Sequence, residues 1–170
     1  MGFVLVLGGA RAGKSDFAQR LALASGLPVT LIATAAALDS EMAERIERHR
    51  VLRPPLWSTV EEQLDLSGAM AAAGDSSFLI VDCLTLWVSN LLHAGLGSEE
   101  IGVLARAAAQ QLEAHRGAVV SNEVGLGIVP ANELARTFRD TLGRVNTLFA
   151  DCAERSVLMV AGRVVELSAP

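Results

Sequence analysis

The stretch Gly8-Gly9-Ala10-Arg11-Ala12-Gly13-Lys14-Ser15 follows the pattern G-x-x-x-x-G-K-S, which is typical of a loop that binds phosphate groups. The apolar run at residues 3–7 predicts a buried strand before the loop, and residues 15–25 predict a helix after it. The backbone N–H groups of such a loop and the N-terminus of the helix attract phosphate. Lys14 adds a positive charge, and the Ser15 hydroxyl can bind Mg²⁺. The alternative, a glycine turn with a chance Lys-Ser pair, is disfavoured because motif and context agree.

Short apolar runs alternate with segments that predict helices along the whole chain. Continuous runs indicate strands that are buried on both faces of a parallel sheet. We therefore predict a three-layer α/β P-loop NTPase fold with a mostly parallel central sheet, formed by a single domain over residues 1–170. Ligands of such sheets bind beyond the carboxyl ends of the strands. The predicted strands are residues 3–7, 29–33, 78–81, 118–120, 157–161 and 164–167, and the predicted helices are residues 15–25, 40–50, 60–73, 84–95, 99–115 and 131–154.

Composition and charge exclude several other classes of protein. Of the 170 residues 51% are hydrophobic, which suits a substantial core, and the formal net charge of −5 argues against a nucleic-acid partner. No apolar run has the length of a membrane span, and no charged leader precedes the first strand, so we expect a cytoplasmic protein. The two cysteines, Cys83 and Cys152, are too few for a disulfide framework or a zinc site.

Asp82 comes directly after the apolar run at residues 78–81. A carboxylate at the end of a strand beside a phosphate loop can hold Mg²⁺ or one of its bound waters. We therefore interpret Asp82 as the second acidic element of a phosphate-loop enzyme. The alternative is a structural role, in which Asp82 caps the helix that begins near Leu84.

His49 lies in a predicted helix that is rich in arginine. Met42, Ile46 and His49 follow the spacing i, i+4 and i+7, so they share one helical face, and a packing role is one interpretation. The neighbouring arginines suit polyphosphate binding, and their charge favours the neutral, nucleophilic imidazole. A solvated charged face would have the same arginines, so the residues alone leave the role of His49 open.

The segment at residues 123–130 is rich in glycine and unusually apolar for a loop. We interpret it either as a mobile or ligand-facing segment at the carboxyl edge of the sheet or as a loop covered by a neighbouring subunit. The Asn/Thr-Lys-x-Asp signature with which signalling GTPases bind guanine does not occur, because Ser121-Asn122-Glu123-Val124 has no lysine. A switch GTPase is therefore disfavoured.

Taken together, these motifs resemble those of one family, the bifunctional adenosylcobinamide kinase / adenosylcobinamide-phosphate guanylyltransferases of cobalamin synthesis. The resemblance covers essentially the whole chain, and residues 122–130 with Arg144-Val145-Asn146 are more specific than the phosphate loop alone. The other matching stretches are residues 8–15 and 32–35, Glu41-Met42, Arg45-Ile46, His49-Arg50, Arg53-Pro54, Trp57, Asn90-Leu91-Leu92, Arg136, Phe138-Arg139-Asp140 and Gly143.

The resemblance implies an enzyme with two activities. A nucleoside triphosphate, ATP or GTP, phosphorylates adenosylcobinamide, and GTP then donates GMP to adenosylcobinamide phosphate, which gives adenosylcobinamide-GDP and pyrophosphate. The family uses a guanylylated histidine, which the match places at His49, and Lys14 is the second catalytic residue. The family also implies a homotrimer. The alternatives from the residues are a single-activity P-loop small-molecule kinase, in which His49 is structural, and a nucleotide-binding regulatory module.

The resemblance also assigns the nucleotide contacts and the metal ligands. Family members can carry a histidine where this chain has Arg48 and a glutamate where it has Asp82, so the contact of Asp82 with metal or guanine stays open. The expected Mg²⁺ ligands are Ser15 and Asp82. The expected nucleotide contacts are Gly8, Gly9, Ala10, Arg11, Ala12, Gly13, Lys14, Ser15, Ala33, Thr34, Ala35, Arg50, Val51, Leu52, Arg53, Glu61 and Asp82.

Overall fold

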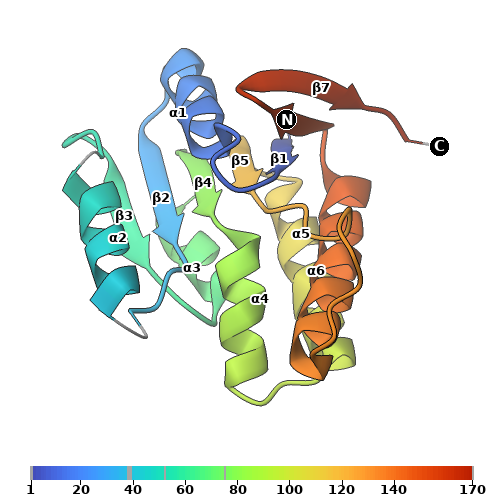
Figure 1. Ribbon diagram of the computed structural model, residues 1–170. Coiled ribbons are helices and arrows are strands. Elements are labelled where there is room, and N and C mark those ends of the chain that lie inside the picture. Colours follow the sequence, from blue (N-terminus) through green and yellow to red (C-terminus); the bar gives the residue numbers. More distant parts are fainter. Residues whose placement is uncertain (1, 38–39, 52, 75, 170) are drawn as a thin grey trace.

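The computed structural model describes residues 2–37, 40–51, 53–74 and 76–169, without the side chains at positions 41, 42, 45 and 49. Its strands form one seven-stranded sheet in the order β3-β2-β4-β5-β1-β6-β7 (Figure 1). All neighbouring strands pair in parallel except β6 and β7, which form an antiparallel hairpin. The strands are β1 (Phe3–Gly8), β2 (Val29–Ala33), β3 (Ser58–Glu61), β4 (Phe78–Asp82), β5 (Gly117–Val120), β6 (Arg155–Val160) and β7 (Arg163–Leu167).

Helices cover both faces of this sheet. α1 packs on one face, while α3, α4, α5 and α6 cover the other, and α2 lies beside the β3 end of the sheet (Figure 1). The predicted three-layer, mostly parallel architecture is therefore confirmed. The helices are α1 (Lys14–Ser25), α2 (Ser40–Val51), α3 (Leu66–Ala73), α4 (Leu84–His93), α5 (Ser98–Leu112) and α6 (Glu133–Cys152).

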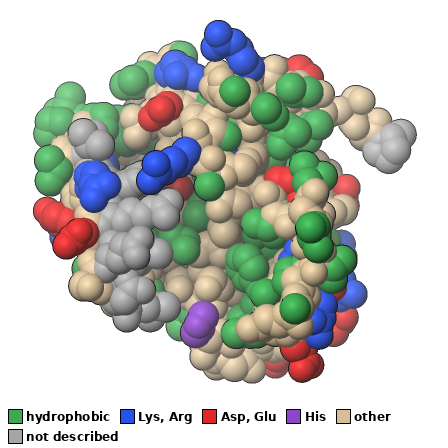
Figure 2. All heavy atoms as spheres, in the orientation of Figure 1, with side chains coloured by type: hydrophobic (Ala, Val, Ile, Leu, Met, Phe, Trp, Pro, Cys, Tyr) green, Lys and Arg blue, Asp and Glu red, His purple; other side chains and the backbone are tan. Residues whose placement is uncertain are grey.

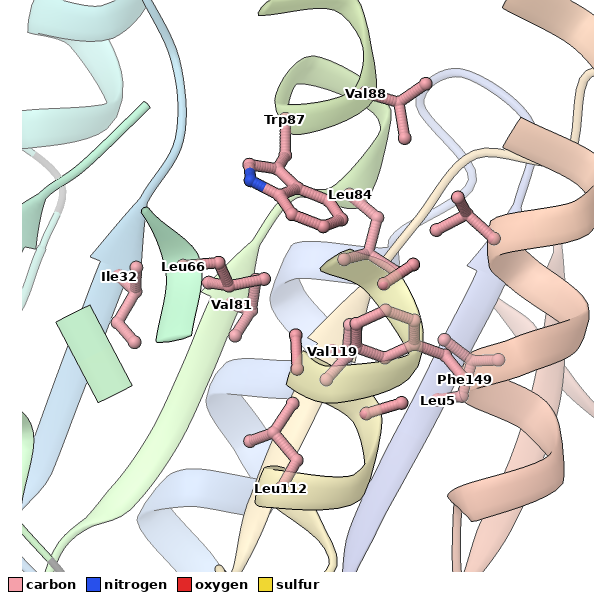
Figure 3. Packing of buried hydrophobic residues seen from close by; sticks show 14 of the residues in the cluster. Leu5, Ile32, Leu66, Val81, Leu84, Trp87, Val88, Leu112, Val119 and Phe149 are labelled. Carbon is pink, nitrogen blue, oxygen red and sulfur yellow. The ribbon is translucent and has the colours of Figure 1, made fainter. Parts of the chain in front are cut away.

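Alternation along the strands divides their side chains between two cores. Val81 and Val119 pack with Phe149 in the larger core, under α3 to α6 (Figure 3). Phe78 and Ile80 pack instead in the core beneath α1. Burial of each such side chain stabilises the fold by about 1.5–3 kcal/mol. Because successive strand residues point to opposite faces, Asp82 falls on the same side of the sheet as Phe78 and Ile80, which is the side of α1.

One predicted element is wrong. Residues 60–73 were expected to form a helix, but residues 58–61 form the edge strand β3, and the helix begins only at Leu66. β3 pairs in parallel with β2, so tertiary pairing determines its conformation. Asp65 then starts α3, since its carboxylate accepts a hydrogen bond from the N–H of Gly68 at 2.9 Å.

The segment that joins β5 to α6 exposes large apolar side chains. Leu126 is 85% exposed and Ile128 is 97% exposed, and Val124 and Val129 are exposed as well. Figure 2 shows hydrophobic side chains where Figure 1 places this segment, in front of α6. Both interpretations of the segment, contact with a ligand or with a second subunit, remain predictions. Among the described helices, none has the length and apolarity needed to cross a membrane.

Candidate nucleotide-binding site

The loop after β1 has the backbone conformation that its glycines allow. Gly13 has a φ of 93° as the N-cap of α1, where a side chain would be strained. Gly8 lies so close to β6 that a Cβ atom would come within 2.6 Å of the Met159 carbonyl oxygen. The Lys14 side chain is buried, and its Nζ donates a hydrogen bond to the Gly9 carbonyl at 2.7 Å. The loop therefore holds an ammonium group and a helix N-terminus at one place, which suits a bound phosphate.

Ser15 and Asp82 meet across the sheet edge, although 67 positions separate them in the chain. The Ser15 hydroxyl donates to Oδ2 of Asp82 at 3.4 Å. The residue at the N-cap of α4 is Cys83, so Asp82 lies one residue before the position from which a side chain usually caps a helix. Asp82 instead faces the phosphate loop, as its position on the α1 side of the sheet requires.

This oxygen pair fits a magnesium ion that also binds phosphate. Mg²⁺ usually takes one or two protein oxygens and completes its octahedron with waters and substrate phosphates. The described residues include no group of three or more His, Cys, Asp or Glu side chains that could hold a metal by themselves. The Ser15–Asp82 pair therefore suits a metal that arrives with a nucleotide.

A pocket of about 500 Å³ opens at this edge of the sheet. Residues 10–16 of the loop and α1 form one side, and the ends of β2, β4 and β5 form its base with Ala33, Asp82 and Val120. Ile46 of α2 and Arg53, which follows that helix, line the pocket as well. Of the expected nucleotide contacts, those that line the pocket are Ala10, Arg11, Ala12, Gly13, Lys14, Ser15, Ala33, Ala35, Arg53 and Asp82.

The other expected contacts lie elsewhere. Thr34 is completely buried. Arg50 and Val51 are exposed on α2, and Glu61 lines a second pocket of about 610 Å³, which shares Ala35 and Ile46 with the first. Gly8 and Gly9 precede the lining part of the loop, although the Gly9 carbonyl binds Lys14. The side chain of His49 and the whole of Leu52 lie outside the described part of the chain.

Arg50 nevertheless connects the helix of His49 to this second pocket. Its guanidinium lies 3.8 Å from the Glu61 carboxylate, and both side chains are about half exposed. An ion pair of this exposure contributes little to stability. It therefore leaves both groups accessible to a ligand.

Several pocket residues were not among the expected contacts. Cys83, Thr85 and Leu86 lie within four positions after Asp82, and Asp16 follows Ser15, so proximity in the sequence was their only signal. Asn122 had a stronger signal, because it begins the most specific of the matching stretches. Its N–H donates to the Thr85 hydroxyl at 2.8 Å, so Asn122 also joins the end of β5 to α4.

Cys83 lines the pocket but is not a nucleophile at neutral pH. Burial and the neighbouring Asp82 carboxylate raise the pKa of its thiol to about 11. The reactive form of cysteine is the thiolate, so a thiol with this pKa stays protonated and inert.

Comparison with known proteins gives the same interpretation as the pocket. Residues 4–167 match the model of the family described as cobinamide kinase / cobinamide phosphate guanyltransferase. The chain belongs to this family. The match covers nearly the full length and includes every residue of the pocket, so the resemblance inferred from the motifs is confirmed, and with it the class of enzyme, a transferase with kinase and guanylyltransferase activity.

Individual relatives agree over almost their whole length. The bifunctional adenosylcobalamin biosynthesis protein CobP of Pseudomonas aeruginosa is 44% identical, over 93% of this chain and 92% of its own. The bifunctional adenosylcobalamin biosynthesis proteins CobU of Salmonella typhimurium and Escherichia coli are 42% and 38% identical, each over 96% of this chain and 98% of their own.

Proposed function

We propose that one pocket of this enzyme serves both reactions of its family. In the first, the γ-phosphoryl group of ATP or GTP passes to the hydroxyl of adenosylcobinamide. In the second, GTP donates GMP to the phosphate so formed, and pyrophosphate leaves. The observation that carries the proposal is that the phosphate loop, Asp82 and Ile46 of the His49-bearing helix all line the same pocket.

Lys14 and the loop N–H groups hold the outer phosphates in both reactions. In the kinase step they stabilise the charge that develops on the transferring γ-phosphoryl group. In the guanylyl step they hold the β- and γ-phosphates, which depart together as pyrophosphate. Ser15 and Asp82 would hold Mg²⁺, which offsets phosphate charge when it is bound.

His49 is the proposed nucleophile of the second reaction. An imidazole nitrogen attacks the α-phosphorus of GTP, so that a P–N bond forms and the bond to the leaving pyrophosphate breaks. The phosphate of adenosylcobinamide phosphate then attacks the same phosphorus and releases the imidazole. Two moderate barriers replace one high barrier. Position 49 follows Ile46 by three residues on α2, which is about one helical turn.

Labelling with radioactive GTP tests this assignment. We expect [α-³²P]GTP to leave an acid-labile label on the protein and [γ-³²P]GTP to leave none. His49→Ala removes the label, whereas His93→Ala keeps it, since His93 is an exposed histidine of the neighbouring pocket. Labelling of His49→Ala at the parent level overturns the nucleophile. Phosphorylation of a small alcohol without any labelling of the parent protein identifies a single-activity kinase instead.

A homotrimer is the proposed assembly. The exposed apolar side chains at Leu126, Ile128 and Val129 support a covered surface next to the site. Light scattering coupled to size-exclusion chromatography measures the assembly directly: three copies of the chain are expected, and a monomer at micromolar concentration contradicts the proposal.

A further inference from the structure

Thr34 has no exposed atom, although the sequence resemblance placed it among the nucleotide contacts. It follows directly after β2, where its neighbours Ala33 and Ala35 line the phosphate pocket. A completely buried side chain cannot touch a nucleotide in that pocket. Its polar atoms must therefore serve another part of the structure.

The polar atoms of Thr34 converge on the two residues at the end of β4. The Thr34 hydroxyl donates to the Cys83 carbonyl at 2.7 Å and accepts a hydrogen bond from the Cys83 N–H at 2.8 Å. The Thr34 N–H donates to the Asp82 carbonyl at 3.1 Å. Three hydrogen bonds thus fix the backbone on both sides of the bond between Asp82 and Cys83.

Thr34 is itself held from behind by α4. The side-chain amide of Asn90 donates to the Thr34 carbonyl at 2.7 Å and to the Gln63 carbonyl at 3.2 Å. Asn90 is 9% exposed, so these bonds form away from bulk water, where a polar group that loses its partner is costly. The backbone of Thr34 is therefore held on its α4 side by Asn90, which does not line the phosphate pocket.

Among these hydrogen-bonded residues, Asp82 is the one whose carboxylate faces the pocket and the phosphate loop. Its Oδ2 accepts the hydrogen bond from Ser15, and the backbone to which it belongs is the one that Thr34 holds. A hydroxyl that can both donate and accept is needed to bind a carbonyl and an N–H of the same residue, and valine, which has the same shape, can do neither. The oxygen pair at the pocket thus depends on one buried hydroxyl behind it.

We propose that Thr34 is a positioning residue, which orients the Asp82 carboxylate toward Ser15 for the metal–nucleotide complex and does not touch the nucleotide. This inference rests on the proposed role of Asp82 as a Mg²⁺ ligand. Groups behind a metal ligand typically change metal affinity by roughly 10- to 100-fold when they are removed. The inference therefore predicts a defect in metal affinity and not in binding of the nucleotide itself.

Two affinities measured on the same variants test the proposal. Mn²⁺, which replaces Mg²⁺ and is paramagnetic, is titrated by electron paramagnetic resonance in the presence of α,β-methylene-GTP, an analogue that cannot donate GMP. Affinity for the analogue in EDTA is measured by calorimetry. The variants are Thr34→Val, Thr34→Ser and Asp82→Asn, with Thr30→Val as the matched control, because Thr30 is a buried threonine of β2, the strand that Thr34 follows.

We expect Thr34→Val to weaken Mn²⁺ binding about 10-fold or more and to change analogue binding in EDTA less than about 2-fold. Thr34→Ser, which keeps the hydroxyl, and Thr30→Val bind Mn²⁺ like the parent. Parent-like Mn²⁺ affinity in Thr34→Val overturns the inference, as does an equal loss of both affinities. If Thr34→Val does not fold, Asn90→Ala replaces it, with the same expected split between the two affinities and the same outcomes against the inference.

Asp82→Asn separates this inference from the proposed function. If Asp82→Asn binds Mn²⁺ like the parent, Asp82 is not a metal ligand, and the proposed function is then wrong at that residue. If Asp82→Asn loses Mn²⁺ affinity while Thr34→Val keeps it, the metal role of Asp82 stands and the positioning role of Thr34 fails.

Discussion

The two sides of the pocket are built in different ways. On the loop side, Lys14 is buried, Gly8 touches the backbone of β6, and hydrogen bonds join the loop to the strand ends. On the α2 side, none of the side chains that the structure describes in that helix is buried, and its ion pair with Glu61 is open to solvent. One side therefore has a geometry fixed by packing, while the other offers accessible side chains.

This difference matches the demands of two reactions in one pocket. Attack at the γ-phosphorus and attack at the α-phosphorus both need the outer phosphates held in place, and a packed loop provides this before substrate arrives. The group that attacks changes from one reaction to the other. Exposed side chains on α2 can change partners at a lower cost than buried ones, since they lose fewer packing contacts.

Replacement of Lys14 removes a charge from the packed, loop side of the pocket and has the largest expected effect. Lys14→Met removes the charge that faces the phosphates while it keeps an apolar stem of similar length. We expect both activities and the GMP label to fall by about 10³-fold, because both reactions use the same cation. Single-turnover assays with ATP and GTP measure this. Arg20→Met, which removes an exposed cation of α1 that does not line the pocket, is the control. Loss of only one activity in Lys14→Met contradicts a shared phosphate site.

A methyl group at Gly8 tests how tightly the packed side is fixed. A Cβ atom there would lie 2.6 Å from the Met159 carbonyl oxygen, so β1 and β6 must move apart in Gly8→Ala. We expect a loss of about 1–3 kcal/mol in the free energy of unfolding. Urea denaturation measures it. Gly9→Ala is a matched control, because a Cβ atom at Gly9 meets nothing within 4 Å. Equal stability of the two variants contradicts the tight packing of Gly8.

Removal of the charge at Glu61 tests the exposed α2 side of the pocket and has the smallest expected effect. Glu61→Gln breaks the exposed pair with Arg50, so the free energy of unfolding should change by less than about 0.5 kcal/mol. We expect the KM for GTP to rise, since the family resemblance places Glu61, but not His93 of the same pocket, among the nucleotide contacts. Glu166→Gln, at the exposed pair with Arg155 on the β6–β7 hairpin, should leave that KM unchanged. A destabilisation above about 1 kcal/mol shows that the α2 side is more firmly packed than its exposure indicates.

The features that the sequence predicted are those that depend on neighbours in the chain. The loop at residues 8–15 and the acid at the end of β4 are read from short stretches, and the structure brings Ser15 and Asp82 together. The continuous apolar runs also predicted the central strands, because burial on both faces leaves a clear pattern. Local patterns were thus sufficient for the central strands and for the phosphate side of the pocket.

What the sequence could not predict depends on partners far along the chain. β3 has only four residues, mostly exposed, and owes its conformation to pairing with β2. The structural role of Thr34 depends on Cys83 and Asn90, which lie 49 and 56 positions away. No local property of a threonine after a strand indicates such partners. The sequence also left open whether Asp82 caps a helix or holds a metal, because its contact with Ser15 joins residues that are 67 positions apart.

The alternation of side chains along β4 also limits where this chain can gain or lose a residue. Asp82 is on the α1 side of the sheet because an even number of positions separates it from Phe78 and Ile80. Insertion or deletion of one residue within this strand would turn the carboxylate into the apolar core under α4 and bring an apolar side chain to the phosphates. A change of length inside β4 is therefore incompatible with the position of this carboxylate beside the phosphate loop.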